Sequence, residues 1–209
     1  MTTYFKAVRP DGGSFHDPNF KWSLEPGGTT VHPAPHRDDA SGYLSVATLA
    51  TACTGMQWPC RLLEVEPVGE TWVPEPDGLP YKVAGHGWRK VGERPAHEVF
   101  GPYGKQVVAI IDRCKTMTEA EAEAMRAAWN AERYTTWNVA LDAAGDAAWD
   151  VVWDAERYTA TDVAWAALDA AWDAERYTTL AYLAKDLITD EHFRLLVAPW
   201  ESVMGKVEA

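Results

Sequence analysis

Short apolar runs separated by turn residues dominate the first half of the chain. Residues 4–8 are apolar apart from one lysine and end at the turn Arg9-Pro-Asp-Gly-Gly13. Residues 61–66 end with the alternation of apolar and charged positions that is typical of a half-buried strand. The same criteria predict strands at 43–47, 81–84 and 88–91, with a long loop at 23–41. We therefore expect a small mixed β-rich domain.

The apolar segment 106–112 fits either a strand or a helix, because its periodicity does not decide between them. It comes shortly before a helix cap, so we favour a short helix. We place the domain boundary after it, which gives a β-rich domain at 1–115 and a helical region with C-terminal docking helices at 116–209.

Helix-forming residues fill the second half. Thr118-Glu-Ala-Glu121 has the spacing of a capping box, in which hydroxyl and carboxylate satisfy two backbone N–H groups. From there to Ala198 the chain has no proline, and Gly145 is its only glycine. Alanine, which has the highest helix propensity, is abundant. The sequence therefore predicts an α+β fold class, with a long Ala/Trp-rich α-helical region after the β-rich domain.

One phrase, Trp-Asx-Ala-Glu-Arg-Tyr-Thr, occurs three times, starting at Trp129, Trp153 and Trp172. The unequal spacing excludes a solenoid of fixed period. A single helix over 118–187 would be roughly 100 Å long at the usual rise per residue. The tryptophans would also fall on opposite sides of it, so we expect two or three helices packed as a hairpin or bundle, or a long helix embedded in an oligomer. Leu180–Ile188 predicts an amphipathic helix, and a last helix is expected from the Thr189 cap to Val197, stopped by Pro199.

The net charge of −12 is unevenly distributed. Residues 1–115 contain 12 Lys/Arg and 13 Asp/Glu, whereas residues 116–209 contain 7 and 18, a net of −11. Such an acidic surface repels phosphates and anionic lipids, so we expect neither nucleic-acid nor membrane partners. Three cysteines without metal-type spacing predict free thiols in a reducing, intracellular protein.

Acidic residues at a spacing of four form a ladder in the helical half, together with two tryptophans one turn apart. The ladder consists of Asp142, Asp146, Asp150 and Asp154, and the tryptophans are Trp149 and Trp153. The ladder fits a solvated helix face or a patch for a basic partner. We expect the Trp pair to be buried in a core or an interface, because an exposed pair would be sticky. These six residues are the predicted partner-binding site.

The N-terminal half offers weaker candidates for chemistry. His32 and His36 are four residues apart, but Pro33 and Pro35 interrupt any helix, so a polar loop is expected and no metal site. Glu64 and Glu66 share one strand face, where paired carboxylates do acid–base chemistry or simply face solvent.

Four features carry a resemblance to a known family. They are the opening Tyr4-Phe-Lys-Ala-Val-Arg-Pro-Asp-Gly12, the central Arg61-Leu-Leu-Glu-Val-Glu66, the Ala-Trp-Asp-Ala repeats, and the ending from Lys185-Asp-Leu-Ile to Val203-Met-Gly205. With these the chain resembles a family of small uncharacterised proteins from phages of actinobacteria. The resemblance implies a phage accessory protein in the host cytoplasm or associated with the virion, and no established activity.

A second resemblance covers only the N-terminal half. A first strand with Tyr4, then Gly42-Tyr-Leu-Ser-Val-Ala47, then a strand with glutamates is similar in order to compact ADP-ribosyltransferase-type folds. It implies NAD as cofactor, with Ser45 and Glu64 or Glu66 at the nicotinamide ribose and Arg9 or His16 earlier. The sequence departs from those folds at the key strand position, where their usual His or Arg has no clear counterpart.

Two functions follow. The first is a non-enzymatic interaction protein without cofactor, which forms homo-oligomers or binds a host or virion protein. The alternative is an ADP-ribosyltransferase-like enzyme, or a decayed relative, with its site in residues 1–115. Convergence of Arg9, His16, Ser45 and Glu64 or Glu66 on one cleft would favour the enzyme.

Overall fold

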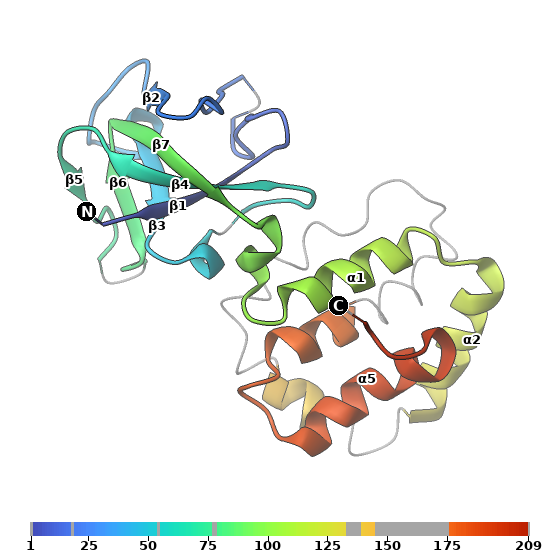
Figure 1. Cartoon of the computed structure of the whole chain (residues 1–209). Coiled ribbons are helices and arrows are strands. Elements are labelled where there is room, and N and C mark those ends of the chain that lie inside the picture. Colours follow the sequence, from blue (N-terminus) through green and yellow to red (C-terminus); the bar gives the residue numbers. More distant parts are fainter. Residues whose placement is uncertain are drawn as a thin grey trace. The chain divides into compact units, whose positions relative to one another are not determined.

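The computed structural model describes residues 2–17, 19–53, 55–76, 79–132, 139–144 and 176–208. The chain divides into two compact units, Met1–Gly101 and Pro102–Ala209 (Figure 1). The first unit is built on a β-sheet and the second on helices, and each is considered separately below.

The first unit contains one seven-stranded sheet with the strand order β2-β7-β4-β1-β3-β6-β5, and all its pairings are antiparallel. The strands are β1 (Tyr4–Val8), β2 (Thr29–Val31), β3 (Leu44–Ala47), β4 (Arg61–Pro67), β5 (Thr71–Trp72), β6 (Lys82–Gly85) and β7 (Gly87–Arg94). Three 3-10 turns accompany them, namely η1 (Ala40–Gly42), η2 (Ala50–Ala52) and η3 (Ala96–Phe100).

The central strand β1 is paired very differently on its two sides. It pairs with β4 along its whole length, from Tyr4 opposite Val65 to Val8 opposite Arg61. It pairs with β3 at a single position, where Phe5 lies opposite Ala47. The sheet is therefore least continuous between β1 and β3.

The strands predicted at 4–8, 43–47, 61–66, 81–84 and 88–91 are confirmed as β1, β3, β4, β6 and β7. The prediction of one long loop at 23–41 is wrong, because this segment contains β2 and the start of η1. β2 and β5 are the edge strands, with three and two residues. Strands of two or three residues are too short to show an alternation of apolar and polar positions in the sequence. They are recognised only by their pairing with neighbouring strands.

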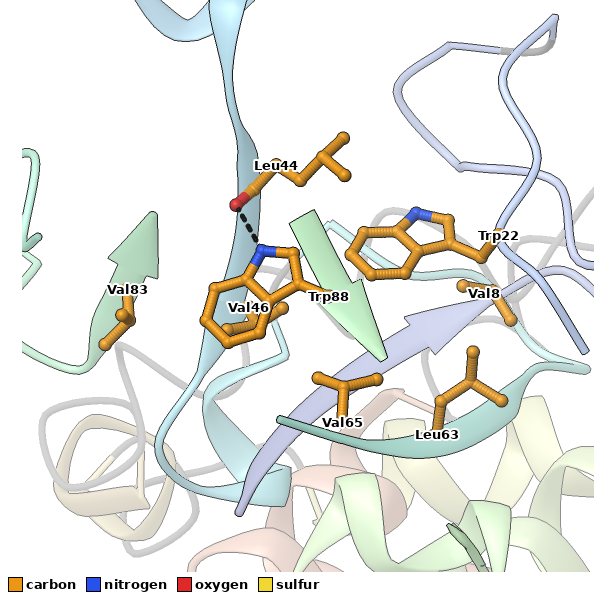
Figure 2. Packing of buried hydrophobic residues seen from close by; sticks show 8 residues of the cluster. All are labelled: Val8, Trp22, Leu44, Val46, Leu63, Val65, Val83 and Trp88. Carbon is orange, nitrogen blue, oxygen red and sulfur yellow. Dashed lines mark hydrogen bonds between the residues drawn. The ribbon is translucent and has the colours of Figure 1, made fainter. Parts of the chain in front are cut away.

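One face of the sheet carries the main apolar core of this unit (Figure 2). Alternation along the strands places Val8, Val46 and Val65 on this face, around the fully buried Trp88. The Trp88 indole N–H donates a hydrogen bond to the carbonyl of Leu44 at 3.1 Å (Figure 2). This bond satisfies the one polar atom of a buried tryptophan ring and ties β7 to β3.

The prediction of a long α-helical region is wrong. The described helices of the second unit are α1 (Gly104–Cys114), α2 (Glu119–Glu132), α5 (Asp190–Met204) and the helical residues 139–144 and 176–183. The longest of them, α5, has 15 residues. An isolated Ala-rich helix buries little apolar area, so the chain folds back and its helices pack on one another. Helix α2 packs against α5, and the rings of Trp129 and Tyr177 lie 5.2 Å apart.

Local signals in this unit have mixed outcomes. The short helix expected at 106–112 is confirmed as α1, which belongs to the second unit. The helix expected over 180–188 ends earlier, at Leu183, and residues 176–183 are its described part. Among the described residues, no helix has both the length and the apolar composition that crossing a membrane requires.

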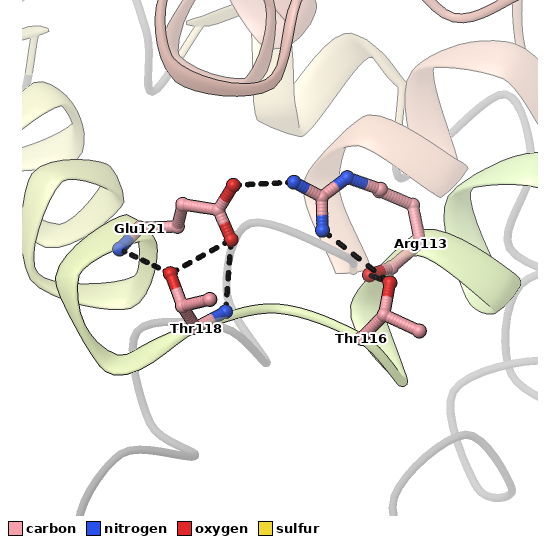
Figure 3. Close-up of polar contacts among 4 residues, drawn as sticks. All are labelled: Arg113, Thr116, Thr118 and Glu121. Atoms are coloured by element: carbon pink, nitrogen blue, oxygen red, sulfur yellow. Dashed lines mark hydrogen bonds and ion pairs between the residues drawn. The ribbon is translucent and has the colours of Figure 1, made fainter.

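The capping box at the start of α2 is confirmed (Figure 3). The Glu121 N–H donates to the Thr118 hydroxyl at 3.3 Å, and the Thr118 N–H donates back to the Glu121 carboxylate at 2.8 Å. The Arg113 guanidinium also contacts this carboxylate and thereby connects α1 to α2 (Figure 3). These interactions lower the pKa of Glu121, mainly through the hydrogen bonds from Thr118.

The last helix begins as predicted but ends later. Thr189 caps α5 by accepting a hydrogen bond from the N–H of His192 at 3.2 Å. The prediction that Pro199 stops the helix is wrong, because α5 continues to Met204 and Gly205 ends it with a φ of 79°. A helix-interior proline costs about 3 kcal/mol, and we attribute its tolerance to the burial of Pro199 and Trp200.

Candidate functional site

A cluster of aromatic and cationic side chains lies at the β5 edge of the sheet. We call Arg37, Tyr43, Trp72 and His86 the Trp72 cluster. The Arg37 guanidinium lies 4.3 Å from the centre of the Trp72 ring. Tyr43 and His86 meet the same ring edge to face, with centroids at 5.5 and 5.1 Å. The loop that carries Arg37 and Tyr43 and the turn between β6 and β7 thus converge on one tryptophan.

Backbone hydrogen bonds fix the loop that carries Arg37. The His36 N–H donates to the carbonyl of Gly42 at 3.0 Å, and the Asp39 carboxylate accepts from the Ser41 N–H at 2.8 Å. The His36 ring lies so close to Gly42 that an added Cβ there would be 2.4 Å from it. The loop is therefore held in one arrangement, and a side chain at Gly42 would displace the histidine.

The Trp72 cluster remains partly open to solvent. Its three rings are half-buried, and the Arg37 side chain is 49% exposed while paired with Glu70 at 2.5 Å. Two exposed valines, Val68 and Val73, flank β5 in the sequence and are 44% and 38% exposed, and Val31 on β2 is 58% exposed. Val31 lies opposite Gly87, to whose carbonyl the N–H of Val68 donates a hydrogen bond. Apolar and cationic groups therefore share this edge.

A second feature lies where β1 and β3 separate. A small hollow, partly open to solvent and with room for about one water molecule, is lined by residues of both strands together with Cys53 and Lys82. Lys6 and Ser45 are among the lining residues. Among the described residues, the Lys6 ammonium has no hydrogen bond or ion pair, and it lies 5.3 Å from the centre of the Trp22 ring.

Burial changes the acidity of the groups around this hollow. It lowers the pKa of Lys6 to about 8, with Lys82 acting in the same direction and Cys53 in the opposite one. It raises the pKa of the Cys53 thiol, against the opposing effects of Lys6 and the backbone N–H of Ala7. Burial and nearby Cys53 raise the pKa of Cys60 to about 12. Cys53, Cys60 and Cys114 are described by the structure, and none of them forms a disulfide.

The residues that the sequence proposed for ADP-ribosyl transfer have separate surroundings. The Arg9 guanidinium donates to the carbonyl of Ser14 at 2.5 and 3.1 Å and fixes the 9–14 turn. The exposed His16 ring packs beside Gly55. The Glu66 carboxylate pairs with Arg89 at 2.6 Å.

Ser45 and Glu64 lie on the same face of the sheet, but on strands β3 and β4, with β1 between them. Two strand spacings separate them by about 10 Å across the sheet. The Glu64 side chain lies over Gly92 of β7, away from Ser45. The structure therefore brings Ser45 to the hollow and leaves the four other proposed residues elsewhere.

Most of the predicted partner-binding residues lie outside the described part of the chain. These are Asp146, Trp149, Asp150, Trp153 and Asp154. Asp142 is described, and it is exposed within the helical residues 139–144. The proposed role of the ladder and the Trp pair stays a prediction.

Within the described ranges, no three His, Cys, Asp or Glu side chains lie close enough together to hold a metal ion. His32 and His36 serve the local structure instead. The His32 ring accepts from the Ala34 N–H at 3.2 Å and stacks on Phe20, and the His36 carbonyl contacts the His86 ring at 3.3 Å.

The chain matches no protein-family model, no curated protein and no solved structure. Its function is therefore inferred from its own residues.

Sequence reasoning missed both the Trp72 cluster and Lys6. The cluster has no sequence signal, because its members are up to 49 positions apart and meet only through the strand order. Lys6 did have a sequence signal. It lies two residues from Tyr4 and two from Val8, so it shares their core-facing side of β1.

Proposed function

We propose that the protein is a non-enzymatic phage accessory protein that acts by binding protein in the host cytoplasm, and that the Trp72 cluster is the contact site of its N-terminal unit. The observation that carries this proposal is the convergence of Arg37, Tyr43 and Trp72 on a partly exposed sheet edge. Tryptophan, tyrosine and arginine are the residues enriched at binding hot spots. The exposed Val68 and Val73, which flank β5, add apolar area that a partner would bury.

The partner that we propose is a second copy of this chain. Residues 116–209 carry a net charge of −11, from 7 Lys/Arg and 18 Asp/Glu. The half-exposed guanidinium of Arg37 in the Trp72 cluster pairs with the exposed Glu70, a contact that it would exchange for a carboxylate of the other copy. Opposite charges favour association and set its orientation. The acidic half of one copy is therefore a complementary surface for the cluster of another.

This proposal has more support than ADP-ribosyl transfer from NAD. The guanidinium of Arg9 already binds the carbonyl of Ser14, and the carboxylate of Glu66 already binds Arg89. Neither is positioned beside Ser45, which lies on another strand of the sheet.

Light scattering on the full chain across micromolar concentrations tests the proposal. We expect a mass above the monomer value of 23.2 kDa. Trp72→Ala should shift the mass toward the monomer, and 0.5 M salt should have the same effect on the wild type. Leu49→Ala is the matched control, because Leu49 is 59% exposed and lies outside the cluster.

A monomer mass for the wild type at every concentration would contradict self-association. Equal masses for Trp72→Ala and wild type would place the contact elsewhere. Thermal unfolding of both variants establishes that each is folded, so that a change in mass reports on association.

A further inference from the structure

Aromatic rings surround the ammonium group of Lys185 in the second unit. Its Nζ atom lies 4.6 Å from the centre of the Tyr103 ring, 4.8 Å from that of Phe193 and 5.7 Å from that of Tyr182. All three distances fall within the roughly 6 Å over which a cation is attracted to an aromatic ring. We call Tyr103, Tyr182 and Phe193 the aromatic cage.

The aromatic cage is held by contacts that do not involve the lysine. The Tyr182 ring is buried and meets the Phe193 ring of α5 edge to face, with centroids 5.2 Å apart. The Tyr103 ring, just before α1, lies 6.4 Å from the Tyr182 ring. The Tyr103 hydroxyl donates a hydrogen bond to the Asp186 carboxylate at 2.7 Å. We therefore expect the three rings to keep their positions when the lysine side chain is absent.

The aromatic cage is a poor match for a primary ammonium group. Such a group is strongly hydrated and has three N–H donors. Among the described residues, no side chain or carbonyl accepts a hydrogen bond from Nζ of Lys185, and its recorded partners are the rings. A quaternary ammonium group has methyl groups in place of N–H donors, so it loses no hydrogen bond when it enters a cage of rings. The aromatic cage therefore suits a methylated ammonium group better than the lysine that occupies it.

We propose that the aromatic cage is a binding site for a quaternary ammonium group, such as that of choline or of a trimethylated lysine, and that Lys185 is a tethered occupant which this ligand displaces. The Lys185 side chain leaves the rings without breaking a hydrogen bond or ion pair to a described residue. The Asp186 carboxylate stays at the Tyr103 hydroxyl and adds a negative charge that favours a cation. The site lies in the second unit and does not depend on the Trp72 cluster.

Titration calorimetry of the full chain tests the proposal with two ligands of the same shape. Choline carries a quaternary nitrogen, and 3,3-dimethylbutan-1-ol has a neutral carbon in its place. Lys185→Ala empties the aromatic cage, so it should bind choline at least about tenfold more tightly than the wild type does. It should also prefer choline to the neutral alcohol by at least about tenfold, because the rings attract the charge.

A second substitution tests the rings themselves. Phe193→Leu, added to Lys185→Ala, removes one ring but keeps an apolar side chain, and it should weaken choline binding by about threefold or more. Thermal unfolding establishes that each variant is folded. Equal affinities of Lys185→Ala for choline and the neutral alcohol would overturn the site. Equal affinities of Lys185→Ala and wild type for choline would overturn the role of Lys185.

A readout on the wild type needs no variant to fold. Choline should speed the acetylation of Lys185 by N-hydroxysuccinimidyl acetate at least about twofold relative to the exposed Lys206, because it displaces the amine from the rings. Peptide mass mapping measures both rates, and the neutral alcohol should leave their ratio unchanged. An unchanged ratio with choline would overturn the displacement. Tighter binding of N-acetyl-trimethyllysine amide than of choline would assign the site to a methylated protein, and the reverse order to a choline compound.

Discussion

Arg61 on β4 and Glu93 on β7 form a bidentate ion pair between two neighbouring strands, which we call the Arg61–Glu93 fork. The Arg61 Nε and Nη2 atoms donate to the two carboxylate oxygens of Glu93 at 2.8 and 2.7 Å, and Lys90 adds a third contact at 3.2 Å. About a third of each side chain in the fork is exposed. The hydrogen bonds from Arg61 are the main reason why the pKa of Glu93 falls to about 2.

We expect Glu93→Gln to lower the free energy of unfolding by roughly 1 kcal/mol at pH 7, a value reduced for the solvent exposure of the pair. Because the pKa is lower in the folded state, the stabilisation is complete above the ordinary value of 4.5 and is lost as the pH falls toward 2. Urea unfolding at pH 7 and pH 3 measures it, with Asp112→Asn in the exposed Lys115 pair as control. Equal losses for the two variants would contradict a special role for the fork.

Lys6 gives a pH dependence of the opposite kind. Its pKa of about 8 in the folded state is below the ordinary value of 10.5, so the folded protein carries an unfavourable charge below pH 8. Lys6→Met should therefore raise the free energy of unfolding at pH 7 by on the order of 1–2 kcal/mol, less than the full shift because the side chain is only half-buried.

This gain should shrink as the pH rises from 8 to 10.5, since the wild type then loses the charge in the folded state first. Unfolding of wild type and variant at pH 7 and pH 10 separates the two contributions. A difference of the same size at both pH values would mean that Met changes only the packing against Trp22.

The capping box of α2 gives a prediction for the second unit. Thr118→Ala removes the hydroxyl that accepts the Glu121 N–H and should lower the free energy of unfolding by about 1 kcal/mol. Thr118→Ser keeps the hydroxyl and should cost a few tenths of a kcal/mol at most. Thermal unfolding monitored by helical circular dichroism measures both, and equal losses for Ala and Ser would show that the cap has no energetic role.

Features with a short-range cause were predictable from the sequence. The Thr118–Glu121 box and the Thr189 cap depend on residues within three positions, and both form as their spacing indicates. Strands β1 and β4 show their apolar positions directly. Pro199 shows where local rules fail, because burial in the packed unit outweighs the missing hydrogen bond and α5 continues.

Features with a long-range cause were not predictable. β5 has two residues and exists through its pairing with β6, so Trp72 carried no sign that Arg37 would cover its ring. The long α-helical region was expected from helix propensity, that is, from abundant alanine, the lack of proline and a single glycine between Thr118 and Ala198. Helix propensity says where helices form but not where the chain reverses, and the packing of Trp129 on Tyr177 is a tertiary contact.

The contact between Trp129 and Tyr177 joins the first copy of the repeated phrase to the third. The chain between these two residues therefore begins and ends at one pair of rings. The entropy cost of closing a flexible chain rises by only about 0.6 kcal/mol when its length doubles. We therefore expect the protein to tolerate the gain or loss of a copy of the phrase between these two rings.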